Sequence, residues 1–452
     1  MPPRRQFSQC NWFLSAREYL KNATGTLDRF DSRALVSPHA DRKLYIAIRN
    51  HGLQIREKGH KVIIHCSGLR NRYRQNRYEH PPQAVSASGS GGETVELKTF
   101  KPLFMNNLPV FKAAAVQAAP CFLDSDATIA KASRLIAEAA GNGAKLVVFP
   151  EVFVPGYPYW NWCMTPLEGS VWFRRLCLSS IEIPGPEIDV LCEAARFAGV
   201  YVVIGINERS AHSLATIYNT NVIISPQGVV MGRHRKLVPT FAEKLTWAGG
   251  DGSSMRVYDS ELGRIGMLAC GENTNTLARF TLLAQGELVH IANYIGFPFV
   301  ENHDMTSAIQ IRAGAHSFEG KIFTVVSCSA MSQEIIDAVG IDEKRRRMLS
   351  GKPNAFTGIF GPDGRLVTPP LIDDEGIVYA EIDINRCIEP KQYHDIIGAY
   401  NRFDIFKLRV DRTAQSPANF DEDRTPAACV SGNVDQIGLE TPKIAPRGDA
   451  AG

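Results

Sequence analysis

The sequence of 452 residues contains no apolar run that reaches the roughly 18 residues needed for a membrane-spanning helix. The first residues, MPPRRQFSQCNW, lack the apolar block of a secretory signal peptide. These two absences exclude the usual signals for membrane insertion and secretion. We therefore expect a cytoplasmic protein with no membrane partner.

Paired cysteines are also missing. The ten cysteines are scattered along the chain without a CxxC pair or a metal-ligand spacing. The chain is far too long to be a disulfide scaffold, so this pattern indicates reduced thiols in a reducing compartment. A structural zinc site is not expected.

Positive charge is concentrated at one end of the chain. Residues 1–106 hold 18 Lys and Arg against 8 Asp and Glu, whereas the remainder holds 32 against 39. The stretch RNRYRQNRY (70–78) has cations and aromatic rings that could contact phosphates and stack on bases, but no recognisable binding module surrounds it. A solvated basic segment is the favoured interpretation, and no nucleic-acid partner is expected.

Composition divides the chain into three parts. Residues 1–106 have only short apolar runs and contain the low-complexity linker PPQAVSASGSGGE, so they are predicted to be a basic, flexible extension. A disordered segment, a weak organelle-targeting sequence and sequence from an overlong gene model are the alternatives for this extension. Residues 107–404 are predicted to form one domain, and 405–452 a polar tail that is disordered or becomes ordered on assembly.

The central part alternates between strand and helix patterns, which is typical of an α/β fold. The expected strands are 111–119, 144–150, 199–208, 216–225, 228–236, 263–269, 287–294 and 321–329, and the expected helices are 125–143, 186–199, 274–286 and 304–320. A hairpin is expected at 358–367. With 44% hydrophobic residues, the chain can bury a large core.

Cys270 lies between the expected strand 263–269 and the expected helix 274–286. A strand-to-helix turn presents its side chain at the mouth of a sheet, near the N–H groups and the positive dipole end of the next helix, which favour a thiolate. Cys270 is therefore a candidate nucleophile. Because a single cysteine is more often a buried structural residue, the interpretation needs companion residues.

Three charged residues supply such companions. Glu151 follows an apolar strand, so partial desolvation is expected to raise its proton affinity into the range of a general base. Lys236 follows another strand and can stabilise developing negative charge, and Glu243 comes seven residues later. Alone, each has a simpler explanation: an exposed loop carboxylate, a solvated basic turn, and a partner of Lys236 or Lys244. With Cys270 they form a complete set for thiol attack on a carbon bonded to nitrogen.

Over residues 110–390 the chain resembles the nitrilase branch of the carbon–nitrogen hydrolases. Three motifs occur in order: VVFPEVFVPGYP around Glu151, HRKLVPTFAEKLTWAGGDGS with Lys236 and Glu243, and LACGENTNTLARF around Cys270. The PT-x-x-E and GDGS elements after the lysine distinguish nitrilase-like members from many amidase relatives.

The resemblance implies an α/β fold, a four-layer αββα sandwich of the carbon–nitrogen hydrolase type, with neither a metal nor an organic cofactor. It implies that Cys270 is the nucleophile and Glu151 the general base, that Lys236 stabilises the tetrahedral intermediate, and that Glu243 is a supporting carboxylate. The implied partners are a small-molecule nitrile and further copies of the chain, in a dimer or a larger spiral.

The aromatic turn GYPYWNW (156–162) is expected to line the entrance to the site, with Tyr157 nearest Glu151 and Trp160 further out. A packed structural loop is the alternative. Gly271 is also predicted to contact substrate. Many nitrilases have tryptophan at this position and histidine two residues later, where this chain has Asn273, so the departure concerns substrate preference.

The predicted function is therefore that of a nitrilase, which converts an organic nitrile to the carboxylic acid and ammonia through a thioimidate and a thioester on cysteine. An amidase or another carbon–nitrogen hydrolase of the superfamily is one alternative. A non-catalytic interaction protein on this fold is another.

We expect the N-terminal extension to be unnecessary for folding and catalysis, because it offers little periodic apolar surface and no catalytic partner. A chain that begins at Pro102 should express as a soluble oligomer with nitrile-hydrolysing activity per molecule within about twofold of the full chain, the scatter expected for changes outside the core. Insoluble protein, or folded protein that has lost most of its rate, would show that the extension is part of the domain.

Overall fold

The computed structural model describes residues 108–299, 303–416 and 418, together with four short strands nearer the N-terminus. The chain divides into two compact units, Met1–Met105 and Asn106–Gly452. Each unit is described by itself.

The N-terminal unit contains a four-stranded antiparallel sheet, which the short apolar runs in the sequence did not predict. Its strands lie in the order β1 (Tyr45–Ala47), β2 (Leu53–Lys58), β3 (Lys61–Cys66) and β4 (Val95–Glu96). The basic stretch 70–78 and the linker 81–93 lie outside the described residues, so the flexible extension stays a prediction.

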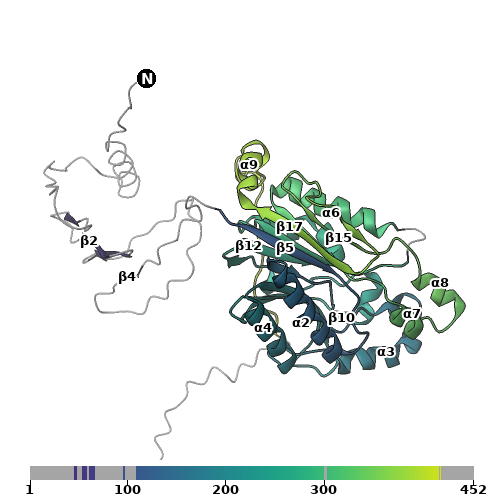
Figure 1. The fold of residues 1–452 in the computed structure, drawn as a ribbon. Helices are drawn as coiled ribbons and strands as arrows, with labels where there is room; N and C mark the ends of the chain where they lie inside the picture. The colour runs from purple at the N-terminus through teal and green to yellow at the C-terminus, as the bar shows by residue number, and fades with distance from the viewer. Residues whose placement is uncertain are drawn as a thin grey trace, which may run out of the picture. The chain divides into compact units, whose positions relative to one another are not determined.

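The second unit is built on two mixed sheets (Figure 1). The first consists of β5 (Val110–Gln117), β6 (Ala144–Val148), β7 (Tyr201–Arg209), β8 (Ile217–Ile224), β9 (Val230–Arg235), β10 (Trp247–Ala248) and β17 (Gly376–Asp383). Its order is β10-β8-β7-β6-β5-β17, and β9 also pairs with β8. The central strands β5, β6 and β7 are parallel, so their carboxyl ends meet at one edge.

The second sheet follows chain order. It consists of β11 (Tyr258–Ser260), β12 (Gly263–Ala269), β13 (Val289–Tyr294), β14 (Phe323–Cys328), β15 (Phe356–Phe360) and β16 (Leu371–Ile372). Its central strands β12, β13 and β14 are parallel. Every residue of β13 and β14 is buried, as expected for parallel strands that are covered on both faces.

Helices connect and cover the strands. They are α2 (Ser125–Gly141), α3 (Pro166–Leu178), α4 (Pro186–Ala198), α5 (Thr276–Leu283), α6 (Met305–Gly320), α7 (Gln333–Val339), α8 (Glu343–Leu349) and α9 (Ile388–His394), with 3₁₀ helices η1 (Tyr159–Trp162), η2 (Phe241–Leu245), η3 (Gly252–Ser254), η4 (Cys270–Thr274) and η5 (Ile384–Cys387). Within the described residues, every helix is too short or too polar to cross a membrane.

The two sheets pack face to face through apolar side chains. Ala113 and Ala115 of β5 share one buried cluster with Ile291 of β13 and Val325 of β14. Small alanines on one sheet opposite branched side chains on the other allow the layers to interdigitate. This apolar layer sets the position of the strand ends of one sheet relative to those of the other.

The outer face of each sheet is covered by helices. On the first sheet, α2 and α4 lie side by side, and Ile136 and Leu191 pack on Val147 and Val202 (Figure 1). On the second sheet, α5 packs against β12, and α6 packs against β14 and β15. The predicted four-layer αββα sandwich is confirmed.

Most of the expected elements are present with ends shifted by a few residues, and Phe360 pairs with Leu366 in the expected hairpin. The helix expected at 274–286 was wrong at its start. The chain after Cys270 first forms η4, and α5 begins at Thr276 because Asn275 accepts hydrogen bonds from the N–H groups of Leu277 and Ala278.

Some helices were not predicted, among them α3, α7, α8 and α9. A local signal for α3 is present in the sequence TPLE. Thr165 and Glu168 form a reciprocal capping box, and Pro166 occupies the first helical position. The short α7 and α8 have too few residues for a clear period.

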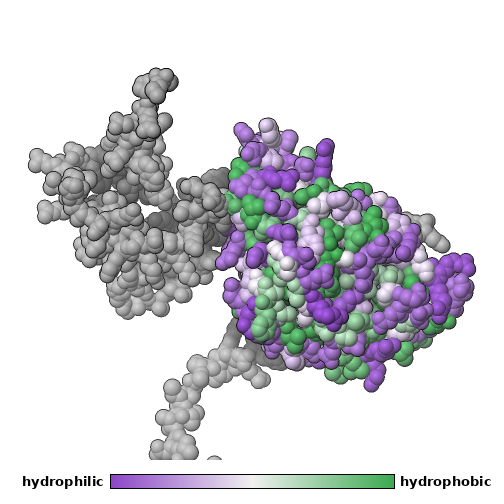
Figure 2. All heavy atoms as spheres, in the orientation of Figure 1, coloured by the Kyte–Doolittle hydropathy of each residue, from purple (hydrophilic) through white to green (hydrophobic). Residues whose placement is uncertain are grey.

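Apolar and polar residues are interspersed on the molecular face in Figure 2. Exposed apolar side chains on helices include Leu167 and Val171 of α3 and Ile311 of α6. Residues 401–416 carry neither helix nor strand, and the Gln415 N–H donates to Asp251 Oδ2 at 2.8 Å. Assembly into oligomers, and ordering of the tail on assembly, stay predictions.

Candidate active site

Three of the predicted site residues form a buried ionic cluster. The Lys236 ammonium donates to Glu151 Oε1 and to Glu243 Oε2, both at 2.8 Å. Each of the three residues is at most 2% exposed. Buried charges of this kind are stable only when they are paired, and the lysine pairs with both carboxylates at once.

Each member comes from a segment that holds its backbone firmly. The Glu151 N–H donates to the Tyr294 carbonyl at the end of β13, and the Lys236 N–H donates to the Asn219 carbonyl of β8. The motif PTFAE forms a capping box, in which the Thr240 N–H donates to Glu243 Oε2 at 2.7 Å. The carboxylate of Glu243 therefore serves both as a helix cap and as a partner of Lys236.

The two oxygens of Glu151 differ in their environment. Oε1 accepts from Lys236 and, at 2.7 Å, from the side-chain amide of Asn219. Oε2 is buried and accepts no hydrogen bond from the described residues. One oxygen is therefore fixed, and the other can accept a proton.

Cys270 lies directly after β12, at the strand-to-helix turn that the sequence predicted. Its backbone φ is +49°, in the left-handed region that residues with a Cβ rarely adopt. The side chain is 5% exposed and belongs to the same buried cluster as Tyr157 and Tyr294.

The expectation that the following helix favours a thiolate was wrong. Burial raises the pKa of the Cys270 thiol well above its usual value, the Glu151 carboxylate raises it further, and Lys236 only partly opposes them. The residues next to Cys270 form the five-residue η4, and α5 starts six residues further on, so no extended helix dipole is directed at the sulfur. The resting thiol is protonated and needs a base.

Glu151 has the properties of such a base. Burial raises the pKa of its carboxyl above the ordinary value, partly opposed by Lys236. Burial by itself would lower the pKa of Lys236, but the carboxylates of Glu151 and Glu243 raise it well above its usual value. The lysine is therefore a permanent cation beside a carboxylate with increased proton affinity.

The aromatic turn has one member at the ionic cluster and one further away. The Tyr157 hydroxyl donates to Glu243 Oε1 at 3.0 Å and accepts from Trp162 Nε1 at 2.9 Å. Trp160 is 1% exposed and stacks on Trp172 with ring centroids 5.9 Å apart. Trp160 is thus largely a packing residue, and substrate contact by Tyr157 and Trp160 stays a prediction.

Gly271 lies against the PT-x-x-E segment. A Cβ at this position would approach Thr240 Oγ1 to 3.0 Å, so a larger side chain would displace the threonine. Substrate contact by Gly271 also stays a prediction.

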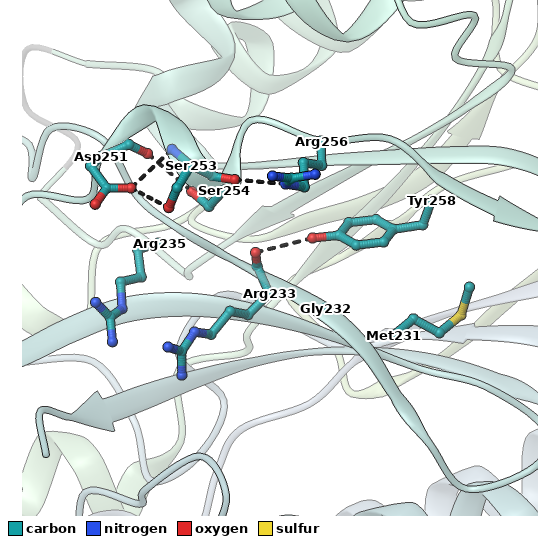
Figure 3. Close-up of a pocket in the computed structure, with 9 residues that line it drawn as sticks. All are labelled: Met231, Gly232, Arg233, Arg235, Asp251, Ser253, Ser254, Arg256 and Tyr258. Carbon is teal, nitrogen blue, oxygen red and sulfur yellow. Dashed lines mark hydrogen bonds between the residues drawn. The ribbon is translucent and has the colours of Figure 1, made fainter. Parts of the chain in front are cut away.

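Two surface cavities lie away from Cys270. One, of about 250 Å³, is lined by Arg233, Arg235, Arg256 and neighbouring residues of β9 and η3 (Figure 3). The guanidinium groups of Arg233 and Arg235 are already paired with the buried Glu208 carboxylate. The other, of about 210 Å³, borders Trp160 and α3.

A second buried polar group lies beneath the turn of Cys270. Glu287 Oε1 is 2.7 Å from His290 Nδ1, and Glu287 Oε2 is 3.0 Å from His316 Nε2. The three side chains are of metal-ligating types and lie close together. However, both distances are those of hydrogen bonds, in which a proton occupies the space between each pair.

The sequence interpretation did not single out Asn219, Glu287, His290 and His316. Asn219 and His290 are polar residues at buried positions of β8 and β13. A polar side chain at an interior strand position must find a partner, so this pattern is a usable signal. The identity of the partner depends on the tertiary structure.

Comparison with known proteins agrees with this geometry. The profile of the carbon-nitrogen hydrolase family matches residues 112–392. An aliphatic nitrilase of Rhodococcus rhodochrous is 37% identical over 68% of this chain and 85% of its own length. A nitrilase 3 from an unknown prokaryotic organism is 38% identical over 68% of this chain and 92% of its own length. A cyanide hydratase of Botryotinia fuckeliana is 32% identical over 75% and 92%.

Solved structures support the fold. A carbon-nitrogen hydrolase from Helicobacter pylori G27 covers 66% of this chain and 97% of its own, with a TM-score of 0.53 and 19% identity. The paired sheets and their outer helices thus define an αββα sandwich of the carbon–nitrogen hydrolase type. The chain belongs to the carbon–nitrogen hydrolase family and, within it, to the nitrilase branch.

The buried histidine group predicts how stability depends on pH. Burial, together with the neighbouring His290, lowers the pKa of His316 to about 4. Burial alone would raise the pKa of Glu287, but His290 and His316 lower it to about 2. Both groups bind protons more readily when unfolded, so their stabilisation is present at neutral pH and is lost on acidification. The contribution of His316 should disappear between its ordinary pKa of 6.5 and about 4.

His316→Gln keeps a donor for Glu287 but cannot titrate. The melting temperature of this variant should fall less between pH 6.5 and pH 4 than that of the natural chain. His394→Gln, which removes an exposed histidine of α9, is the matched control and should leave the slope unchanged. Equal slopes for all three proteins would contradict the assignment of a neutral His316.

Proposed function

We propose that the protein is a nitrilase that hydrolyses an organic nitrile to the carboxylic acid and ammonia. The observation that carries the proposal is the Lys236 ammonium held 2.8 Å from both Glu151 and Glu243, in the buried region that also holds Cys270. Similarity to named nitrilases over most of their length supports a nitrile as the substrate class.

In the first half of the reaction, Glu151 Oε2 takes the thiol proton as the Cys270 sulfur attacks the nitrile carbon. A carbon–sulfur bond forms, one carbon–nitrogen π bond breaks, and its electron pair moves to the nitrogen. That nitrogen takes up the proton that Glu151 received from the thiol, which gives a covalent thioimidate and restores the carboxylate. Lys236 makes two hydrogen bonds to the described residues, so its third N–H is left to stabilise the developing negative charge.

In the second half, Glu151 takes a proton from water, whose oxygen adds to the thioimidate carbon and forms a tetrahedral species. Loss of ammonia leaves a thioester. A second water, deprotonated in the same way, displaces the cysteine sulfur and releases the acid. Glu243 holds Lys236 and Tyr157 in place throughout.

The tetrahedral species can also lose the thiolate, and the amide is then released in place of the acid. Two relatives are named cyanide hydratases, so release of an amide is the second candidate outcome. Measuring ammonia, acid and amide together, over aliphatic, aromatic and arylaliphatic nitriles and their amides, separates nitrilase, hydratase and amidase activity.

The proposal also covers the cellular location, the assembly and the cofactor need of the enzyme. We expect a cytoplasmic homo-oligomer, a dimer or a larger spiral, that needs neither a metal nor an organic cofactor. Size-exclusion chromatography with light scattering measures the assembly. Activity after exhaustive dialysis against a chelator measures any need for a metal.

Cys270→Ala and Cys270→Ser should reduce turnover of the best nitrile by about a thousandfold or more, because neither side chain can form the thioimidate. Their melting temperatures should remain close to that of the natural chain. Cys328→Ala, in another buried cysteine at the end of β14, is the control for removing a buried thiol. Near-normal turnover by either Cys270 variant would refute the proposed mechanism.

Glu151→Gln and Lys236→Ala should each reduce kcat by about 10² to 10⁴-fold, because the base or the compensating cation is lost. Since the two groups act as a unit, the double variant should be little slower than the slower single variant. Lys131→Ala, which removes a partly buried lysine paired with Glu375, serves as the control. Fully additive losses in kcat would indicate that the two groups act independently.

A further inference from the structure

A chain of buried hydrogen bonds reaches the backbone of Cys270 from the side of β13. It runs from Glu287 Oε1 to His290 Nδ1 (2.7 Å), from His290 Nε2 to Asn273 Oδ1 (2.8 Å), and from Asn273 Nδ2 to the Cys270 carbonyl (3.0 Å). Glu287, His290 and Asn273 are each at most 3% exposed. The reaction described above assigns none of these three residues a role.

The donors and acceptors along this chain fix its protons. Asn273 Nδ2 donates to the carbonyls of Cys270 and Leu268, so Oδ1 is the atom that faces His290. An amide oxygen only accepts, so His290 Nε2 must carry a proton. His290 Nδ1 lies 2.7 Å from Glu287 Oε1, and Glu287 Oε2 accepts from His316. Both ring nitrogens of His290 are therefore engaged, with Nε2 donating to Asn273.

A glycine in β12, the strand that precedes Cys270, leaves space for the His290–Glu287 pair. Gly266 of β12 lies directly opposite His290 of β13 in the sheet register. A Cβ at Gly266 would collide with the Glu287 carboxylate, so only glycine accommodates the pair at this position. His316 of α6 donates to the same carboxylate, and its ring packs edge-on against His290 with centroids 4.2 Å apart.

The backbone conformation of Cys270 requires support from neighbouring residues. Cys270 has a φ of +49° without being glycine, and residues with a Cβ keep this conformation only where their surroundings impose it. On the other side of the turn, Glu272 accepts from the N–H groups of Ala269 and Leu237 and pairs with His234. On the β13 side, the side-chain amide of Asn273 donates to the carbonyl of Cys270.

We infer that Asn273, His290 and Glu287 are positioning residues for the nucleophile. The buried pair of His290 and Glu287 fixes the side-chain amide of Asn273, and this amide holds the Cys270 peptide in its left-handed conformation. The thiol is thereby kept in the buried region of the Glu151–Lys236 pair. The inference rests on the proposed function in so far as Cys270 is the nucleophile.

Alkylation of Cys270 by iodoacetamide tests this role without a nitrile. The rate is followed at the peptide that contains Cys270 by mass spectrometry, because the described residues include six other free cysteines. Asn273→Asp keeps the side-chain shape but places a carboxylate oxygen against two carbonyls. Glu287→Gln keeps the shape but removes the charge that pairs with His290.

Both variants should be alkylated at Cys270 at least about tenfold more slowly than the natural chain. Both should also lose about 10- to 100-fold in kcat for a nitrile, with KM changed less than about twofold, because a displaced nucleophile affects the reaction more than binding. His394→Gln, at an exposed position of α9, is the control and should stay within about twofold in both measurements.

A folded Asn273→Asp variant that is alkylated at the natural rate would overturn the inference. If Glu287→Gln fails to fold, Asn273→Asp decides alone. Nitrogen NMR of labelled histidine gives a second test: His290 Nε2 should carry a proton, and an Nε2 without a proton would overturn the hydrogen bond to Asn273. If the natural chain hydrolyses no nitrile but the alkylation rates differ as expected, the positioning role stands and the proposed function fails.

Discussion

The ammonium of Lys236, held between two buried carboxylates, is the interaction on which the rest of the site depends. Without it, Glu151 and Glu243 would be two buried carboxylates with no cation to balance them, and burial would favour their protonated forms. With it, the carboxylates stay paired, while burial still raises the pKa of Glu151 and, together with the Glu151 carboxylate, the pKa of the Cys270 thiol. A protonated thiol beside a basic carboxylate suits a nucleophile that is activated only when substrate arrives.

The double sheet is what brings these charges together. Glu151 follows β6 and Lys236 follows β9 in the first sheet, whereas Cys270 follows β12 in the second. The apolar layer between the sheets brings strand ends from both sheets to one place, so residues more than a hundred positions apart share one buried region. The site therefore depends on the αββα architecture, because its residues come from strand ends of both sheets.

Buried carboxylate–histidine pairs appear on both sides of the Cys270 turn. Glu272 and His234 connect the turn to the segment of Lys236, and Glu287 and His290 connect it to β13 through Asn273. Such pairs are costly to bury and stabilise little by themselves, so their value lies in the geometry that they impose. Here the two pairs lie on either side of Cys270, whose backbone is in the left-handed region.

The sequence by itself determined the strand and helix rhythm, the turn at Cys270, and the positions of Glu151 and Lys236 after strands, because periodicity and end signals are local. It also contained the capping box that fixes Glu243. Only the tertiary structure decided that Lys236 contacts both carboxylates, that Asn219 binds Glu151, and that Glu287 and His290 lie beneath Cys270. It also reversed the expected thiol pKa, since that value depends on burial and on charges from distant segments, which no local pattern encodes.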